Sequence, residues 1–147
     1  MQTHQMIIGM GSNTSPAAEL LKTAVSRLRE MAEGEVVLST PEETEPIDFV
    51  GTSWFTNQVA WMSTGLEPAD VVRRLKRIER QAGRTKAETR QGIVRLDLDL
   101  LWVDGCVLRP DDWQRPYIQR GVAEIQARIA TDGVVCQALF PPDDGCA

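Results

Sequence analysis

The stretch Val94-Arg95-Leu96-Asp97-Leu98-Asp99-Leu100 decides how this chain folds, because apolar and charged residues alternate along it without a break. Side chains alternate between the two faces of a β-strand. Val94 and the leucines therefore lie on one face, and Arg95, Asp97 and Asp99 lie on the other. We predict a strand over Val94–Val103, with its apolar face in the core of a sheet and its charged face half-exposed.

The segments on either side of this strand carry clear boundary signals. Asp104-Gly105 is a strong two-residue hairpin turn that leads into a short strand over Cys106–Leu108. Upstream, Leu66–Ala82 has apolar residues at helical spacing, with Pro68 near its start and Gly83 just past its end. We expect this helix to bury a stripe made of Val71, Leu75, Ile78 and Ala82.

The remaining segments complete the order of elements. We expect strands at Met6–Met10, Val36–Leu38 and Trp54–Met62, and a helix that Ser15 caps, with Pro16 in its first position and Gly34 at its C-terminal end. Two long loops are expected at Pro41–Ser53 and Gly83–Ile93. Beyond Pro110 we expect a helix at about Val122–Ala130 and a strand at about Val134–Phe140.

This order predicts the fold class. A βαββαβ sequence followed by a hairpin is typical of the α+β class with a ferredoxin-like core, an antiparallel sheet with helices packed on it. The remaining residues then form a C-terminal hairpin and helix extension. The 147 residues suffice for one domain, so we expect a single domain over residues 1–147.

Composition excludes several classes of protein. Hydrophobic residues make up 42% of the chain, which is ordinary for a globular protein, and no apolar run approaches the ~20 residues of a membrane helix. The chain opens without a secretory signal, and its three cysteines are odd in number and widely spaced, which favours reduced thiols and a cytoplasmic location. The only histidine is His4, so multi-histidine metal sites are excluded.

Basic residues are concentrated in one stretch. Residues 73–95 hold nine of the sixteen lysines and arginines and carry a net charge of +7, while the rest of the chain carries −12. Such a stripe on an acidic protein indicates an anionic ligand bound at one place. A solvated helix face is the alternative interpretation.

Asp97 and Asp99 are the first candidate site. Two residues apart on one strand, their Cα atoms lie about 6.6 Å apart, and their like charges repel unless a cation lies between them. Paired carboxylates suit Mg²⁺, which binds through one or two carboxylates together with substrate phosphates. Alternatively, Arg95 neutralises one of the aspartates on an exposed face. No phosphate-binding loop of the Gly-x-x-x-x-Gly-Lys type and no dinucleotide fingerprint occurs in the chain.

Four short segments together resemble one enzyme family. They are Ile8-Gly9-Met10-Gly11-Ser12-Asn13, Phe55-Thr56-Asn57-Gln58-Val59, Arg77-Ile78-Glu79 with Gly83-Arg84, and Leu96-Asp97-Leu98-Asp99-Leu100-Leu101. In order and spacing they resemble 6-hydroxymethyl-7,8-dihydropterin pyrophosphokinase, over about residues 6 to 122. That folate-pathway enzyme transfers pyrophosphate from ATP to a pterin alcohol and releases AMP.

The resemblance implies roles for individual residues. Asp97 and Asp99 match the aspartates that bind two Mg²⁺ ions between the ATP phosphates, and Asn57 matches the asparagine that reads the pterin edge. By the same resemblance, the catalytic residues are Arg84, Arg95, Asp97 and Asp99. The pterin-binding residues are Thr44, Glu45, Ile47, Phe55, Asn57 and Val122. The nucleotide-binding residues are Lys76, Glu79, Arg84, Lys86, Leu100 and Tyr117.

The chain also departs from the family pattern. The family's Arg-Trp-Gly-Pro-Arg-Thr loop is replaced by Arg90-Gln91-Gly92-Ile93-Val94-Arg95. A one-residue shift moves a strand side chain to the opposite face, so Arg95 is expected to point with the aspartates. Tyr117 takes the place of a histidine, and Val122 takes the place of the second aromatic residue that stacks on the pterin.

Other interpretations of single residues remain open. Asn57 could hold a neighbouring loop, Phe55 could belong to the core, and Arg84 could answer the dipole of the preceding helix. For Trp61 and Trp102 the core is the preferred assignment.

Three functions are therefore considered. The leading one is an ATP- and Mg²⁺-dependent pterin pyrophosphokinase with ATP and a reduced pterin as its partners, and no nucleic acid, membrane or obligate protein partner. The second is a relative that binds pterin or nucleotide without the transfer, or that acts on another alcohol. The third is a ferredoxin-like RNA-binding module, against which the first strand, Met6–Met10, offers no aromatic residue to stack on a base.

Overall fold

The central strand of the sheet is β1 (His4–Ser12), which pairs with β4 (Phe55–Thr64) on one side and β5 (Asp97–Val103) on the other. The computed structural model describes residues 2–45 and 53–131. Beyond these strands lie β2 (Val37–Leu38), β3 (Glu42–Thr44) and β6 (Cys106–Val107). All pairs are antiparallel, and the strand order is β2-β4-β1-β5-β6, with β3 also paired to β4. This order confirms the predicted α+β, ferredoxin-like core, in which two split β-α-β units interleave.

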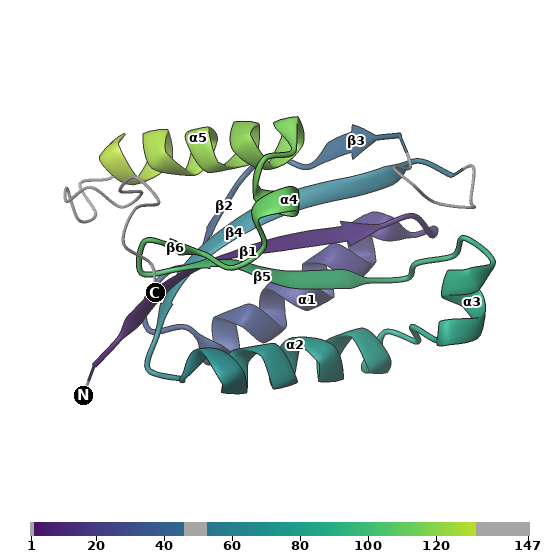
Figure 1. Ribbon diagram of the computed structural model, residues 1–147, viewed down its shortest axis with the longest axis horizontal. Coiled ribbons are helices and arrows are strands. Elements are labelled where there is room, and N and C mark those ends of the chain that lie inside the picture. Colours follow the sequence, from purple (N-terminus) through teal and green to yellow (C-terminus); the bar gives the residue numbers. More distant parts are fainter. Residues whose placement is uncertain (1, 46–52, 132–147) are drawn as a thin grey trace.

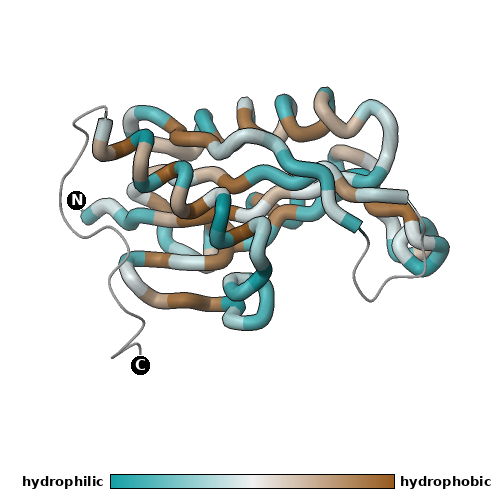
Figure 2. Tube along the Cα trace, turned by 90° about the horizontal axis from the view of Figure 1, so that it is seen from above, coloured by the Kyte–Doolittle hydropathy of each residue, from teal (hydrophilic) through white to brown (hydrophobic). Residues whose placement is uncertain are grey.

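Helices cover both faces of this sheet (Figure 1). On one face, α1 (Ala17–Met31) and α2 (Pro68–Gln81) pack on alternate residues of β1 such as Met6, Ile8 and Met10. On the other face, α5 (Pro116–Thr131) packs on Ile7 and the neighbouring strands. Figure 2 shows hydrophobic residues along the strands and alternating hydrophobic and hydrophilic residues along the helices. Each helix thus buries one stripe and exposes the other.

The predicted stripe of α2 is confirmed with a small correction at its end, because Val71, Leu75 and Ile78 are buried. The buried residues of α1 are Leu21, Ala24, Val25, Leu28 and Met31. Ala82 is half-buried at the end of α2, and Gly83 follows with φ +99°, a conformation that favours glycine. The prediction that Ser15 caps α1 is wrong, because Pro16 is the N-cap residue and makes no side-chain capping bond.

Several predicted boundaries move. The strand expected from Val94 begins at Asp97, and the register against β1 shifts between Ile7 and Ile8 because β5 carries a bulge at Leu101. The bulge lets Leu100 face α1 and α2 while Leu101 and Trp102 face α5. Trp61 and Trp102 lie in the core, as expected.

Both predicted loops contain structure. Within Pro41–Ser53, β3 pairs with β4, and no local sequence pattern predicts this tertiary contact. Within Gly83–Ile93 lies α3 (Lys86–Arg90), where the Thr85 hydroxyl accepts a hydrogen bond from the backbone N–H of Glu88 over 3.1 Å. Thr85 and Glu88 have the spacing of a capping box, which is a readable sequence signal for a helix start.

The C-terminal part of the chain is also more helical than expected. A short helix, α4 (Pro110–Trp113), precedes α5, which starts at Pro116 rather than Val122. The strand expected at Val134–Phe140 lies outside the described residues.

Two sequence-based expectations concern the cellular location of the protein. Among the described residues, no helix is long and apolar enough to cross a membrane. The expectation of reduced cysteines is wrong for Cys106, which is disulfide-bonded, while Cys136 and Cys146 lie outside the described residues. The cytoplasmic location therefore stays a prediction.

Asp104 joins the β5–β6 turn to the start of β1. Its carboxylate accepts hydrogen bonds from the backbone N–H of Gln5 over 2.8 Å and from Nδ1 of His4 over 2.7 Å. Asp104 has φ 49° and Gly105 φ 94°, as the predicted Asp-Gly hairpin turn requires. The hydrogen bond to Asp104 is the largest influence on the His4 pKa, which is raised above its ordinary value.

This ion pair predicts a pH-dependent stability. Because the folded-state pKa of His4 is raised, its contribution is fully present below about pH 6.5 and is lost as pH rises through the folded-state value. We expect His4→Gln to lower the free energy of unfolding by about 0.5 kcal/mol at pH 5.5 and to have little effect at pH 9. Urea unfolding at both pH values measures it, and an equal effect at both would contradict the assignment.

Candidate active site

One row across the sheet places the main candidates side by side. Gly11 of β1 is paired with Asn57 of β4 on one side and with Asp97 of β5 on the other. Paired residues of neighbouring strands point to the same face, so Asn57 and Asp97 lie on the α5 face, separated by two strand spacings of about 4.8 Å each. Sequence reasoning named both residues, and the sheet brings them together.

Glycines in β1 let neighbouring side chains approach the strand closely in this row. A Cβ atom on Gly11 would lie 2.9 Å from Oδ1 of Asn57, and one on Gly9 would lie 3.1 Å from Cδ1 of Leu101. Gly9 is in turn paired with Asp99, so both aspartates have glycine as their neighbour in β1. The motif Gly9-Met10-Gly11 therefore provides a floor without side chains between the asparagine and the carboxylate pair.

Each aspartate of the carboxylate pair has an arginine as its ion-pair partner, Arg84 for Asp97 and Arg109 for Asp99. Burial, and after it the charge of Asp97, raise the pKa of Asp99 to about 7. The nearest cation to Asp99 among its ion pairs is Nη1 of Arg109, 3.8 Å from Oδ1. No group of three or more His, Cys, Asp or Glu side chains within residues 2–45 and 53–131 is arranged to hold a metal. Two adjacent carboxylate donors fit a divalent cation that takes its other ligands from water and substrate.

A buried carboxylate fixes the start of β5. Glu79 of α2 is only 5% exposed, and its Oε2 accepts a hydrogen bond of 2.7 Å from the backbone N–H of Leu98. The same oxygen lies 3.3 Å from Nη1 of Arg84, and Oε1 lies 3.4 Å from Nζ of Lys76. Arg84 also donates to Oδ1 of Asp97 over 2.8 Å. Arg84 is therefore held at the carboxylate pair rather than left as a solvated helix-end cation.

Asn13 gives the Gly-Ser-Asn motif a structural role. Its Nδ2 donates to the carbonyl of Gly92 and its Oδ1 accepts from the backbone N–H of Val94, both over 2.7 Å. The backbone N–H of Asn13 also donates to the carbonyl of Val94 over 3.0 Å. The end of β1 thus fastens the loop that leads into β5.

Two small cavities lie over this row. One, of about 140 Å³, is bounded by Thr44, Glu45, Phe55, Asn57 and Tyr117 together with Gly11, Asp97, Asp112 and Arg115. The other, of about 50 Å³, adds Gly9 and Asp99. Four of the six predicted pterin residues line the first cavity. Asn57, 9% exposed, also donates to Oγ1 of Thr44 over 2.6 Å, so it holds β3 as well as facing the cavity.

A larger cavity, between α2 and α3, collects the basic residues. It measures about 610 Å³ and is lined by Lys76, Glu79, Arg80, Arg84, Thr85, Lys86, Thr89 and Arg90. Five of the nine basic residues of the predicted stripe line it, and so do four of the predicted nucleotide residues. Of the other two, Leu100 has its side chain in the core and Tyr117 lines the cavities near Asn57.

Two predicted site residues, Arg95 and Val122, lie elsewhere. Arg95 precedes β5 and does not point with the aspartates: its Nε and Nη2 each donate to Glu88 over 2.9 Å, and its Cδ lies against Gly83. Val122 is 5% exposed in the core between α5 and the sheet, so it is not presented to the pterin cavity as expected. Ile47 lies outside the described residues.

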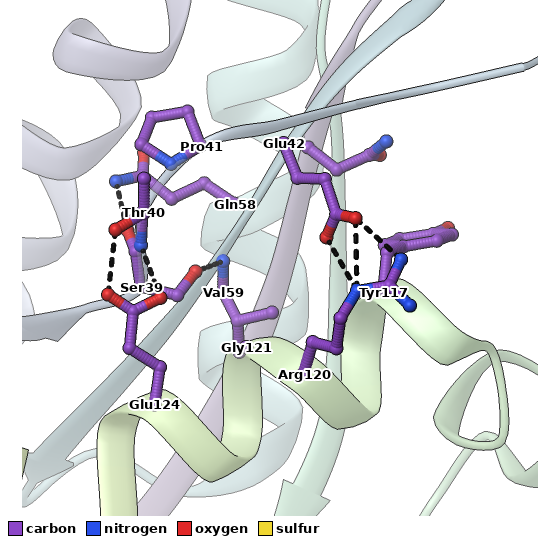
Figure 3. Close-up of a pocket in the computed structure, with 11 residues that line it drawn as sticks. Ser39, Thr40, Pro41, Glu42, Gln58, Val59, Tyr117, Arg120, Gly121 and Glu124 are labelled. Carbon is purple, nitrogen blue, oxygen red and sulfur yellow. Dashed lines mark hydrogen bonds and ion pairs between the residues drawn. The ribbon is translucent and has the colours of Figure 1, made fainter. Parts of the chain in front are cut away.

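Another cavity adjoins the site on the α5 side. It measures about 270 Å³ and shares Asn57 and Tyr117 with the smaller cavities. Figure 3 shows its walls, where Glu124 binds Thr40 and Glu42 binds Arg120. Gly121 allows the close approach of α5, since a Cβ there would meet Val59 at 2.5 Å.

Sequence reasoning missed three charged residues next to the carboxylate pair. Asp112 lines both small cavities and Arg115 lines one, while Arg109 lies beside Asp99. Asp112 lies in α4, a helix of four residues, and Arg109 and Arg115 flank that helix. The only sequence signal was the cluster of charged residues between Arg109 and Arg115.

Comparison with known proteins now identifies the family. Residues 7–127 match the family described as 7,8-dihydro-6-hydroxymethylpterin-pyrophosphokinase (HPPK). The chain belongs to this family. It is similar to the 2-amino-4-hydroxy-6-hydroxymethyldihydropteridine pyrophosphokinase of Bacillus subtilis, with 33% identity over 83% of this chain and 78% of that protein. The Pseudomonas putida protein of the same name is 32% identical over 72% of this chain and 88% of its own.

Longer proteins match as well. The folate synthesis bifunctional protein of Arabidopsis thaliana is 27% identical over 78% of this chain, and the match covers 25% of its length. The chain thus spans about a quarter of that relative.

The role of Glu79 gives a stability prediction. Glu79→Ala leaves the Leu98 N–H and Arg84 without their buried partner, so we expect the free energy of unfolding to fall by about 2–4 kcal/mol. Glu19→Ala, on the exposed side of α1, is the control, with a change of about 0.5 kcal/mol or less. Urea unfolding of both variants measures the difference, and equal losses would contradict the bridging role of Glu79.

Proposed function

We propose that this protein transfers pyrophosphate from ATP to the hydroxymethyl group of 6-hydroxymethyl-7,8-dihydropterin in folate biosynthesis. The observation that carries this proposal is the row of Asn57, Gly11 and Asp97, with Asp99 beside it, in a member of the HPPK family. An amide that reads a ring edge and a carboxylate pair that neutralises phosphates lie about 10 Å apart across a glycine floor. That spacing suits a two-ring heterocycle whose single alcohol arm points at the carboxylates.

The pterin occupies the cavity bounded by Thr44, Glu45, Phe55 and Asn57. Asn57 donates one amide hydrogen to Thr44, and this hydrogen bond fixes the orientation of the Asn57 side chain. The carbonyl oxygen and the second amide hydrogen of Asn57 remain available for the ring edge. Phe55, at the start of β4, offers one aromatic face to the ring. Because Val122 is buried, the second face is bounded by Tyr117, which lines the same cavity.

ATP occupies the basic cavity, with its phosphates toward Asp97. Lys76 and Arg84 are held by Glu79, and Lys86 stands at the start of α3 on the other wall. Asp97 and Asp99 hold Mg²⁺, which supplies neutralisation of the phosphate charge when bound. The backbone at Leu100 meets the adenine, in line with the family pattern.

The reaction is one displacement at phosphorus. The pterin hydroxyl oxygen forms a bond to the β-phosphorus of ATP, the bond between that phosphorus and the oxygen bridging to the α-phosphate breaks, and AMP leaves with the bridging oxygen. The hydroxyl proton is released. The residues of the chain position the two substrates and stabilise charge on the transferring group, Arg84 from its place beside Asp97.

The carboxylate pair gives the first test. Asp97→Asn and Asp99→Asn each remove one negative oxygen donor without changing size, so we expect AMP formation from ATP, Mg²⁺ and the reduced pterin to fall by about 10³-fold or more. Asp111→Asn, an exposed aspartate on α4, serves as the control and keeps wild-type turnover. Full activity in either Asp97→Asn or Asp99→Asn would overturn the metal assignment, and a wild-type protein that binds pterin without forming AMP would establish a binding protein instead.

Asn57 gives a test of substrate placement. Asn57→Ala removes the amide that faces the ring edge, so the KM for the pterin should rise by about 10-fold or more while the KM for ATP changes little. Gln58→Ala, on the next residue of β4, is the matched control. Equal losses of affinity for both substrates would show that Asn57 acts through β3 and not through the pterin.

A further inference from the structure

Asp112 stands between two arginines at the edge of the carboxylate pair. Its Oδ2 accepts a hydrogen bond from Nε of Arg109 over 2.8 Å, and its Oδ1 accepts one from Nε of Arg115 over 3.2 Å. Asp112 is half-buried and lines both small cavities, in company with Asp97. One carboxylate therefore holds two guanidinium groups on the wall of the proposed active site.

The atoms used in these contacts decide what the arginines can still do. A guanidinium group has five N–H donors in a rigid fork, and both arginines bind Asp112 through Nε. The Nη groups of both arginines are not used in these two hydrogen bonds to Asp112 and can bind other groups. One of them, Nη1 of Arg109, lies 3.8 Å from Oδ1 of Asp99, and Arg115 lines the cavity that contains Asp97.

The charges favour an anionic ligand at this place. Burial tends to raise the pKa of Asp112, but the hydrogen bonds from Arg109 and Arg115 outweigh it and leave the pKa below its ordinary value. Asp112 is therefore ionised, and the three side chains together carry a charge of +1. Without a metal, Arg109 forms an ion pair with Asp99. When a cation binds to the aspartates, the Nη groups of Arg109 become available for the phosphate oxygens of the ligand that binds with the cation.

We propose that Asp112 is a positioning residue that aims Arg109 and Arg115 at the polyphosphate chain of the nucleotide. The proposal rests on the proposed function, because it takes the bound nucleotide to lie at Asp97 and Asp99. Arg109 changes partner from Asp99 to phosphate when the metal nucleotide binds, while its Nε stays on Asp112. Bidentate and branched contacts of this kind suit arginine and are closed to lysine.

Asp112→Asn tests the proposal, with Asp111→Asn as the matched control on the same helix. We expect the Kd for a Mg²⁺ complex of a non-hydrolysable ATP analogue to rise by about 10-fold in Asp112→Asn and to be unchanged in Asp111→Asn. The KM for ATP should rise with it, while the KM for the pterin should not. Asp112→Glu, which keeps the charge, should restore part of the nucleotide affinity.

A double variant tests the proposal independently of Asp112→Asn, and AMP formation by the wild-type protein tests the proposed function separately. Arg109→Lys with Arg115→Lys preserves charge but removes both Nε donors, so it should weaken binding of the analogue as Asp112→Asn does, even where Asp112→Asn folds poorly. Equal analogue binding by Asp112→Asn and Asp111→Asn, or a wild-type protein that binds no analogue, would overturn the proposal. A wild-type protein that binds the analogue and forms no AMP would overturn the proposed function alone.

Discussion

The pairing of β1 on both sides is the constraint on which the rest of this structure depends. Because β1 lies between β4 and β5, its residues from Met6 to Gly11 have a paired neighbour on both sides, and their alternation sets that of the adjoining strands. Met6, Ile8 and Met10 point to α1 and α2, which obliges Ile7, Gly9 and Gly11 to point to α5. In the row of Asn57, Gly11 and Asp97, the central position therefore carries no side chain.

The position of β5 depends on a second residue, Glu79. The paired aspartates are useful only if β5 begins at a fixed place, and the 2.7 Å bond from the Leu98 N–H to Glu79 secures that place from α2. Burying a carboxylate is unfavourable unless it is paired and hydrogen-bonded, and Glu79 has Arg84 and Lys76 as well as the backbone. The same contacts that satisfy this buried charge place Arg84 on Asp97, so the stability of the strand and the electrostatics of the site share one residue.

Sequence reasoning found what local pattern and motif encode. The strand around Asp97, the buried stripe of α2 and the Asp104-Gly105 turn were readable, because alternation and turn chemistry act on neighbouring residues. Asn57 was found only through the resemblance of its motif to a family. What it missed depends on contacts distant in sequence. β3 forms only because β4 offers a free edge, and Arg95 leaves the aspartate face only because Glu88 and Gly83 receive its side chain. The burial of Val122 likewise results from the packing of α5 on the sheet, which the local sequence around Val122 does not reveal.

The fastening of the loop between α2 and β5 has a consequence for sequence divergence. Its first end is fixed by Arg84 on Asp97 and its last by Asn13 on Gly92 and Val94. Between these two anchors, α3 buries no side chain and is held by its Thr85 cap and by the ion pair of Glu88 with Arg95. Substitutions there leave both anchors in place, so this segment can drift without displacing the strand that carries Asp97 and Asp99. The departures from the family pattern at Gln91 and Ile93 fall in this segment, whose two ends are held by Arg84 and Asn13.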